Sequence, residues 1–524
     1  MKKPQKNLEV LTMIKYRFIL IFACFSMSST EGVSQRTYSA NSLLSTGAWY
    51  KLSINDPGIY KIDISLFNSL GINTSGLASN SIRIFGNGGQ MLAEANAVSR
   101  PDDLVENAIM VVDGGDGIIN GSDYILFYAN GPDEWVKDSA NASFSHRKNL
   151  YSEKSFYFLN IGVNGKRIFD APIMISPNIT VTSFSERNFH EINTVNFLGS
   201  GKEWYGEELS GLPGRSLTRN FTINIPGIVN NAPLMLRSNC VARSVGVGSR
   251  FEIRVNSLPA VPLNINSISG GQYDLFAQQA TNLVIGSATS SNISVNYTYF
   301  PGSLNAQGWI NWFELFTRRN ISLQGINQLL FRDWPSVGNN VAEFVVTNAS
   351  TSTQVWDITD PLNPLKMPGN FVNNEFHFVN NCARLREYIA FNPSGFLTPV
   401  PLGKISNQDL HNTTPVDLFI VSHPSLLLQA ERLAQLHLQQ NGLRTKVVTT
   451  DQIFNEFGSG SPDPSAIRDF VKMYHDKYGA NSADKPRYLL LFGDASYDYK
   501  NRLNNNTNLV PAYENNFALD PLSS

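Results

Sequence analysis

The sequence predicts a multidomain protein in which two β-rich regions precede the start of an α/β domain with a parallel sheet. Three observations lead to this prediction. Short alternating runs of apolar and polar residues, punctuated by Pro, Gly and Asn, recur through most of the chain. From residue 416 the pattern changes to apolar strands separated by helical segments. The sequence ends at residue 524, before a sheet of this kind would normally be complete, so we expect the last domain to be truncated.

We expect four segments along the chain. Residues 1–35 have the pattern of a secretory signal peptide, because the apolar run Phe18–Phe25 follows Lys15 and Arg17 and precedes small polar residues. That run is too short to span a bilayer, and we expect an exported protein. The other segments are a β-rich N-terminal domain at 36–185, a β-sandwich domain at 186–400 and the incomplete α/β domain at 401–524.

The charge balance argues against a nucleic-acid partner. The chain has 41 basic and 43 acidic residues and a formal net charge of −2, whereas nucleic-acid binding needs clustered basic surface. Charged residues make up only 16% of the chain, and small polar residues are abundant. Such a composition is typical of an exported, β-rich protein.

Two cysteines follow the predicted signal peptide, which itself contains Cys24. Cys240 and Cys382 could form one disulfide in an oxidising compartment. They could equally be two buried thiols that act as small hydrophobic side chains. The sequence leaves both interpretations open.

Alternating runs predict the first strands of the N-terminal domain. Residues 49–54 and 59–62 have the strand pattern, and the Asp56-Pro57-Gly58 turn predicts that they pair as a hairpin. Residues 82–85 predict another strand, which enters the glycine-rich stretch Gly86–Gly89. Since no phosphate-binding helix follows, we interpret that stretch as a tight turn rather than a nucleotide site.

The segment Asp113–Asp123 interleaves aspartates and Asn120 with glycines, as calcium loops do. Its register is imperfect, since the first ligand position of an EF-hand-like loop would fall on Val112. The flanking residues 108–112 and 124–128 have the pattern of strands. We therefore expect a polar hairpin loop and no cofactor, with a weak calcium site as the second hypothesis.

The middle region predicts a β-sandwich with Greek-key or jelly-roll connections. Aromatic residues cluster at Trp309–Phe313 and could stack on sugars, although core packing is the more common role of such side chains. The predicted strands are 218–225, 234–237, 250–255, 283–285, 293–299, 328–330 and 342–346.

The α/β domain begins with a strand at residues 417–421. Pro424-Ser425 opens a helix with a buried stripe, which Asn441-Gly442 ends. A strand at 443–450, a helix that starts at Asp463-Pro464 and ends at Gly479, and a strand at 487–492 follow. This order predicts right-handed crossovers and a parallel sheet. The first stripe comprises Leu426, Ala430, Leu433 and Leu436, and the second Ile467, Phe470, Val471, Tyr474 and Tyr478.

In parallel sheets the chemistry lies beyond the carboxyl ends of the strands, which here are residues 422–424, 449–451 and 493–498. We interpret His423 as a residue that packs at the helix entry, and Asp494 and Asp498 as caps of turns. Ser422 and Ser425 lack the context of a nucleophile elbow. We assign no catalytic, cofactor-binding or metal-binding residue.

Several motifs, in this order, resemble known enzymes. Residues 419–424 (FIVSHP), 429–434 (QAERLA), 445–450 (TKVVTT), 466–470 (AIRDF) and 488–494 (YLLLFGD) resemble the start of the gingipain-type cysteine peptidase domain, which has a caspase-like fold. Upstream, residues 49–51 (WYK), 58–61 (GIYK), 84–89 (IFGNGG), 124–128 (YILFY), 203–207 (EWYGE) and 407–411 (NQDLH) resemble the type IX secretion system sortases of Bacteroidetes-type bacteria.

The resemblance implies an enzyme on the outer surface of a Gram-negative bacterium. It would remove C-terminal sorting domains from exported cargo and attach the cargo to lipopolysaccharide, with outer-membrane secretion components as partners. A cysteine thiolate and a histidine would carry out the acyl transfer. No His or Cys follows Asp494, so we expect the catalytic pair to lie beyond residue 524. The alternative is a non-catalytic surface module that binds carbohydrate or a secretion partner.

Overall fold

Two sheets with a shared core form the N-terminal β-rich region. The computed structural model describes residues 36–338 and 340–523, so the predicted signal peptide at 1–35 lies outside the described residues. One sheet has the strand order β28-β1-β9-β3-β4 and the other β2-β6-β5. The strands are β1 (Ala48–Ile54), β2 (Gly58–Asp63), β3 (Ile82–Phe85), β4 (Glu106–Asn107), β5 (Met110–Val112), β6 (Tyr124–Ala129), β9 (Ser155–Ile161) and β28 (Val400–Ile405), with the short helix α2 (Ile64–Ser69) after β2.

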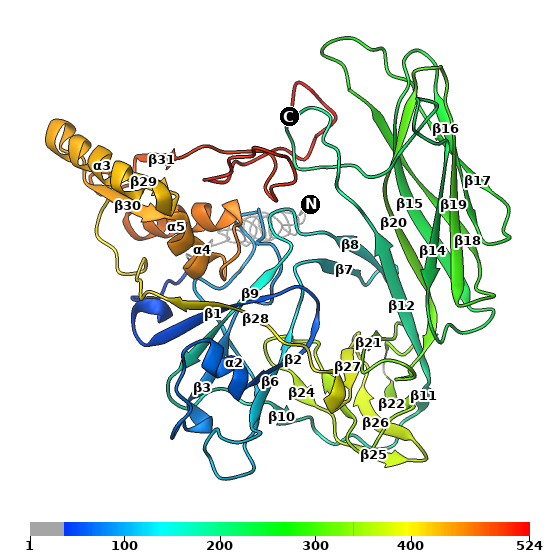
Figure 1. The fold of residues 1–524 in the computed structure, drawn as a ribbon, viewed down its shortest axis with the longest axis horizontal. Helices are drawn as coiled ribbons and strands as arrows, with labels where there is room; N and C mark the ends of the chain where they lie inside the picture. Colours follow the sequence, from blue (N-terminus) through cyan, green and yellow to red (C-terminus); the bar gives the residue numbers. More distant parts are fainter. Residues whose placement is uncertain (1–35, 339, 524) are drawn as a thin grey trace, which may run out of the picture. The chain divides into compact units, whose positions relative to one another are not determined.

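The predicted hairpin between β1 and β2 is wrong. β1 pairs with β9 and β28, whereas β2 pairs with β6. Leu52 and Ile54 of β1 and Tyr60 and Ile62 of β2 all enter one core. The turn therefore carries the chain from one sheet to the facing sheet, because the two strands pack side chain to side chain. Figure 1 shows the late strand β28, in yellow, alongside the blue strand β1.

The loop at 113–123 connects β5 and β6, which pair antiparallel as the sequence predicts. Asp116 Oδ1 accepts a hydrogen bond from the Ile118 amide (2.9 Å), and Asp123 Oδ2 accepts one from the Asn120 amide (2.8 Å). Backbone amides of the loop thus donate hydrogen bonds to the carboxylates of Asp116 and Asp123. Among the described residues, no group of three or more His, Cys, Asp or Glu side chains could hold a metal ion.

The first sandwich, in green in Figure 1, consists of two antiparallel sheets around a large apolar core. One sheet has the order β12-β20-β15-β18, with β13 added to β20, and the other has the order β14-β19-β16-β17. Every strand predicted between residues 218 and 299 is present. The bounds are β12 (Ser183–His190), β13 (Glu208–Ser210), β14 (Thr218–Asn224), β15 (Pro233–Arg243), β16 (Ser249–Val255), β17 (Val261–Ile265), β18 (Gln278–Ser287), β19 (Asn292–Phe300) and β20 (Gln307–Asn320).

A second sandwich has its own core, and its strands come from residues on both sides of the first sandwich in the chain. Its sheets have the orders β10-β24-β23-β27-β21 and β11-β22-β26-β25. We therefore propose that the region predicted as one sandwich domain at 186–400 comprises two. The strands are β10 (Phe169–Asp170), β11 (Ile179–Val181), β21 (Gln328–Arg332), β22 (Val341–Thr347), β23 (Gln354–Asp357), β24 (Leu365–Lys366), β25 (Gly369–Val372), β26 (Glu375–Asn381) and β27 (Glu387–Phe391).

The two described cysteines are both free and buried. Cys240 lies in the core of the first sandwich and Cys382 in the core of the second. The structure thus rules out the disulfide interpretation and agrees with two buried thiols.

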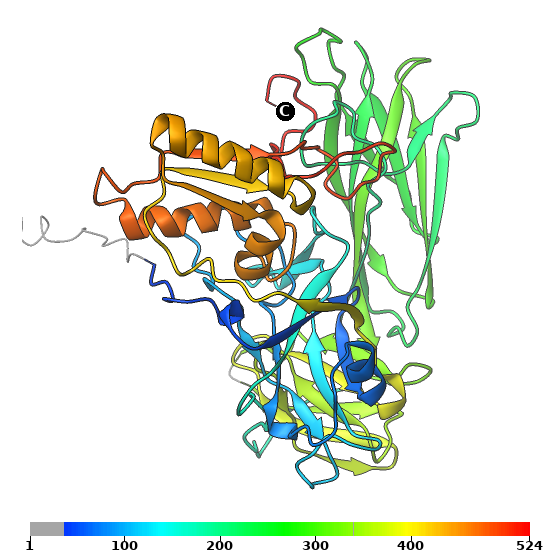
Figure 2. The same cartoon turned by 60° about the vertical axis from the view of Figure 1, so that its left-hand side comes forward.

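The last segment is the predicted α/β unit, with the parallel strand order β30-β29-β31. Figure 2 shows helices on both faces of this sheet. Ala430 and Ala434 of α3 pack on Ile420 on one face, and Phe470 and Tyr474 of α5 pack on Phe419 on the other. The bounds are β29 (Leu418–Ser422), α3 (Leu427–Asn441), β30 (Thr445–Thr449), α4 (Thr450–Phe457), α5 (Pro464–Tyr478) and β31 (Tyr488–Phe492).

Two details of this unit differ from the prediction. Leu436 is 44% exposed, because Ala430 and Ala434 take the buried positions of α3. The predicted strand at 443–450 ends at Thr449, which caps the unpredicted helix α4 through a capping box with Gln452. Among the described residues, no helix combines the length and apolarity needed to cross a membrane.

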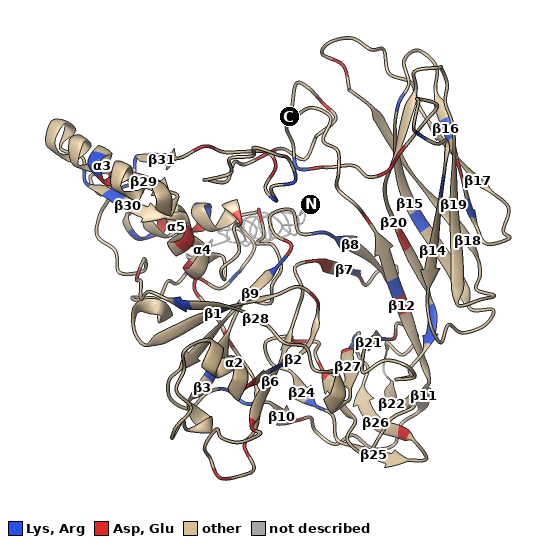
Figure 3. Cartoon of the chain, in the orientation of Figure 1, with Lys and Arg blue, Asp and Glu red and all other residues tan. Residues whose placement is uncertain are grey.

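Acidic and basic residues are distributed over all parts of the fold (Figure 3), and some of them join its parts. Glu387 of β27 lies 3.1 Å from Arg187 Nη2, 3.3 Å from Arg332 Nε and 3.5 Å from Lys137 Nζ. Burial alone would raise the pKa of Glu387, but these three cations lower it to about 2. The carboxylate therefore links the second sandwich to the first and to the hairpin β7 (Glu134–Asp138)–β8 (Ser143–Arg147).

Candidate functional site

The carboxyl edge of the parallel sheet holds the residues that follow β29, β30 and β31. The buried Ser422 hydroxyl donates to the His423 carbonyl (3.1 Å). His423 Nδ1 accepts a hydrogen bond from the Ser425 amide (3.2 Å) at the helix entry. Thr449 Oγ1 accepts from the Gln452 amide (3.3 Å) at the start of α4. All of these groups cap local structure, and His423 has the role that the sequence predicts.

The aspartates after β31 hold the loop that follows it. The Asp494 carbonyl accepts from the Leu509 amide (2.9 Å), and its carboxylate binds the Thr507 hydroxyl. The fully buried Asp498 accepts from the Leu503 amide (2.7 Å) and lies 3.3 Å from Arg502 Nη1. Both aspartates therefore stabilise turns, as predicted. Within the described ranges, no cysteine lies at this edge, because both thiols are in sandwich cores.

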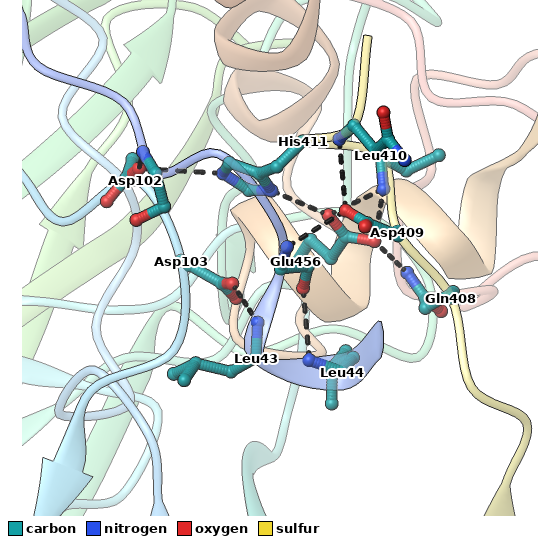
Figure 4. Close-up of polar contacts among 12 residues, drawn as sticks. Leu43, Leu44, Asp102, Asp103, Gln408, Asp409, Leu410, His411 and Glu456 are labelled. Carbon is teal, nitrogen blue, oxygen red and sulfur yellow. Dashed lines mark hydrogen bonds and ion pairs between the residues drawn. The ribbon is translucent and has the colours of Figure 1, made fainter. Parts of the chain in front are cut away.

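A buried polar cluster lies instead where the α/β unit meets the N-terminal region (Figure 4). His411 and Glu456 of α4 are completely buried, and His411 Nδ1 lies 2.8 Å from Glu456 Oε2. Glu456 also accepts hydrogen bonds from the Leu410 amide (2.9 Å) and from Gln408 Nε2 (2.8 Å). The ring of Phe457 stacks on the imidazole, with centroids 5.0 Å apart.

The opposite side of the imidazole faces the N-terminal region. His411 Nε2 lies 3.6 Å from Asp102 Oδ2, which is an ion pair longer than a hydrogen bond. Asp103 accepts from the Leu43 amide (2.7 Å), and Asp409 accepts from the Ser42 amide (2.9 Å). The cluster thus joins residues 42–44, 102–103, 408–411 and helix α4. We call it the His411 junction.

The electrostatics of the His411 junction favour a charged imidazole. Burial alone would lower the pKa of His411, but Asp102 and Glu456 raise it to about 9, with a smaller contribution from Asp103. Burial opposes the charged form of Asp102 too, yet the imidazolium and the Ser39 amide hold its pKa well below its usual range. Burial raises the pKa of Asp103. The arrangement is an internal charge network in which His411 Nδ1 is bonded to Glu456, while the buried Nε2 has only the longer ion pair with Asp102.

A second contact ties β1 to the α/β unit. Lys51 Nζ donates to Asn455 Oδ1 and to the Gly460 carbonyl, both at 3.0 Å, and lies 4.5 Å from the centre of the Phe156 ring. Burial lowers the pKa of Lys51 to about 8, against the opposing charge of Asp451. Both this contact and the His411 junction fix the α/β unit on the β-rich scaffold, as does the hydrogen bond from the Leu92 amide to Asp463 Oδ2 (2.8 Å).

Sequence reasoning did not find the His411 junction. In the sequence, His411 is notable only as the last residue of the motif at 407–411 that resembles known sortases. Glu456 lies in helix α4, which the sequence pattern does not predict. The capping pattern at Thr449 and Gln452 was the local signal that could have revealed this helix. No local signal connects either residue to Asp102.

Comparison with known proteins places these features in a family context. Residues 411–523 match the sequence model described as Peptidase family C25. Dimeric latent PorU from Porphyromonas gingivalis has the same fold, with a TM-score of 0.79 and 23% identity over 92% of this chain and 46% of that chain. The present chain thus spans about half of the PorU chain. No curated protein matches it significantly.

Other solved structures are far more distant. An isomalto-dextranase from Arthrobacter globiformis T6 has 10% identity and a TM-score of 0.17 over 52% of this chain and 36% of that chain. A C-terminal carbohydrate-binding module from a Zobellia galactanivorans enzyme has 14% identity and a TM-score of 0.13 over 24% and 98%. Neither similarity supports a functional conclusion.

Proposed function

We propose, from the match of residues 411–523 to the model of peptidase family C25, that the chain is the N-terminal portion of a cell-surface sortase of the type IX secretion system. The enzyme would cleave C-terminal sorting domains from exported cargo and attach the cargo to lipopolysaccharide. The observation that carries this proposal is the agreement of the fold with latent PorU over 92% of the chain. The expected signal peptide and an outer-membrane location fit the same role.

In this proposal the described residues form the scaffold of the enzyme. The N-terminal β-rich region and the His411 junction hold the parallel sheet, so that its carboxyl edge has a fixed position. Acyl transfer needs a cysteine thiolate and a histidine that moves the proton. Cys240 and Cys382 cannot act as the nucleophile, because both are buried and their burial raises the pKa of each thiol. We therefore propose that the catalytic pair comes from sequence outside residues 1–524.

The experiment begins with the gene. We expect the reading frame to continue beyond codon 524 and to encode a His and a Cys on further strands of the sheet. Deletion of the gene should leave surface cargo with its C-terminal sorting domain attached, as measured by mass spectrometry of cargo termini. The whole frame should restore cleavage, and the same frame with that Cys changed to Ala should not. Normal cargo processing in the deletion strain would contradict the proposal.

The alternative function is a non-catalytic surface module that binds carbohydrate or a secretion partner. A stop codon directly after codon 524 would favour it. One structural observation also favours it, namely a cavity on the first sandwich that is lined by Trp312 together with polar and charged side chains.

A further inference from the structure

A cavity of about 700 Å³ lies against the sheet β12-β20-β15-β18. It is on the face away from the sandwich core, because Ile310 and Phe313 of β20 enter the core while Asn311 and Trp312 line the cavity. The other walls come from β8, from residues 191–204 and from Asn516 near the end of the chain. Its volume is in the range of small-molecule sites.

A β-bulge shapes the floor of the cavity. The pairing of β15 with β20 shifts between Asn239, opposite Trp312, and Cys240, opposite Ile310, so that Asn311 is the extra residue. Neighbours on a regular strand point to opposite faces, yet Asn311 and Trp312 both line the cavity. Bulges commonly redirect side chains in this way next to functional sites.

The charges around the cavity are paired with one another. His146 lies between Glu191 (2.6 Å) and Glu314 (2.8 Å), and Arg237 Nε donates to Glu314 (2.6 Å). Burial alone would lower the pKa of His146, but the two glutamates raise it to about 9. Four other charged residues line the cavity. Arg147 pairs with Glu134 and Lys202 pairs with Glu94, while Lys148 donates to the Glu191 carbonyl (3.1 Å) and Glu203 accepts from Asn311 (2.8 Å). The charged groups of the wall thus have partners within the protein, and the wall does not require a charged ligand.

Trp312 Nε1 and Asn193 Oδ1 are among the groups at the cavity that have no hydrogen-bond partner within the described residues. Trp312 is half-buried, and no described residue accepts a hydrogen bond from its Nε1. Asn193 donates from Nδ2 to Glu191 (2.8 Å), while its buried Oδ1 has no partner within the described chain. The cavity therefore offers an aromatic ring, a donor at Trp312 Nε1 and an acceptor at Asn193 Oδ1. A buried polar atom without a partner is costly, so a ligand or water that reaches Asn193 would be stabilised.

From these features we propose that the cavity is a binding site for a neutral carbohydrate of one to a few pyranose rings. The C–H face of a pyranose packs on an aromatic ring such as Trp312. Its hydroxyls both donate and accept, which matches the free Trp312 Nε1–H and Asn193 Oδ1. The inference depends on the cavity alone, and it goes beyond the proposed peptidase function because it holds whether or not the protein cleaves cargo.

Isothermal titration calorimetry of the full chain tests the site with four neutral probes, each added separately: cellotriose, maltotriose, mannotriose and chitotriose. We expect at least one of them to bind. Trp312→Ala should weaken that binding about tenfold or more, since loss of the ring removes the stacking surface. Trp312→Phe keeps an aromatic face and should weaken it less. Asn193→Ala should weaken it by removing the free acceptor.

The matched control is Phe169→Ala, which removes an aromatic side chain that is 71% exposed on β10 of the second sandwich. It should leave sugar binding unchanged. Thermal melts establish that each variant is folded, and Trp312→Phe and Asn193→Ala decide the question if Trp312→Ala does not fold. Absence of binding for all four sugars would overturn the inference. So would binding that the cavity variants leave unchanged, or binding of an uncharged peptide in place of the sugars.

Discussion

Nδ1 of His411 lies 2.8 Å from Oε2 of Glu456, and neither side chain has any solvent exposure. His411 is the first residue of the segment that matches the model of peptidase family C25, and Asp102 of the β-rich region lies on the other side of its imidazole. Removal of one member of a buried ion pair leaves the other charge without compensation. The attachment of the α/β unit to its scaffold should therefore depend on the charge state of this imidazole.

The first prediction concerns alkaline pH. The folded-state pKa of His411, about 9, exceeds the value near 6.5 expected in the unfolded chain. Its contribution to stability is thus fully present below about pH 6.5 and is lost as the pH rises through about 9. We expect the wild type to lose about 1–3 kcal/mol of its stability advantage over His411→Gln between these limits. Urea denaturation at a series of pH values measures this difference.

Comparison with the variant removes the effects of other groups. The lowered pKa of Lys51 acts in the opposite direction at alkaline pH, because its charged form is disfavoured in the folded state. Lys51 is present in both proteins, as is His146, and their effects cancel in the difference. A stability difference that did not change with pH would show that His411 is uncharged when folded.

The second prediction concerns the partner carboxylate. Glu456→Gln keeps the shape of the side chain and removes its charge, which leaves a buried imidazolium with only Asp102 and Asp103 nearby. We expect a loss of about 3 kcal/mol in the free energy of unfolding, measured by urea denaturation at neutral pH. Glu431→Gln, an exposed position on α3, is the matched control and should change stability by less than about 0.5 kcal/mol. Equal effects of the two variants would argue against a buried charge network.

The sequence could predict the elements of the α/β unit because their signals are local. Gly442, with φ of +64°, ends α3, and Asp463 with Pro464 starts α5. Helix α4 was not predicted because the β-branched run before Thr450 favours a strand. The only local signal for the helix is the capping box, which involves just Thr449 and Gln452.

Long-range contacts have no comparable local signal. A turn such as Asp56-Pro57-Gly58 suits either a hairpin or a passage between facing sheets, and the choice depends on β9 and β28, which pair with β1 from far along the chain. The contact between Asp102 and His411 likewise depends on residues that are far apart in the chain and that the fold brings together. The sequence therefore predicts local elements and the motif order of the family, whereas the junction follows from tertiary packing.

The third prediction concerns the thiols. Cys240 has no exposed surface, Cys382 is 1% exposed, and the two belong to different cores. In a Cys24→Ser background, Ellman's reagent should label neither thiol in the native protein and both in urea. Dithiothreitol should leave the melting temperature unchanged, since there is no disulfide to reduce. A drop in melting temperature on reduction would contradict the free-thiol state.

The last prediction concerns the end of the chain, which crosses back onto the first sandwich. Leu519 packs with Tyr205, Val241 and Trp309, and its carbonyl accepts a hydrogen bond from the Phe276 amide (2.8 Å). Leu519→Ala should destabilise this contact by about 2 kcal/mol, the lower end of the cost for a buried leucine. Hydrogen exchange should then accelerate at Phe276 and across residues 513–523.

Leu522, which is 70% exposed, is the matched control three residues further on. Leu522→Ala removes the same atoms from a side chain that buries little apolar surface, so hydrogen exchange at Phe276 should remain slow. The core of the second sandwich should exchange at the wild-type rate in both variants, since local opening need not spread to it. If the Phe276 amide exchanged at the same rate in both variants, the Leu519 side chain would not be what anchors this end of the chain.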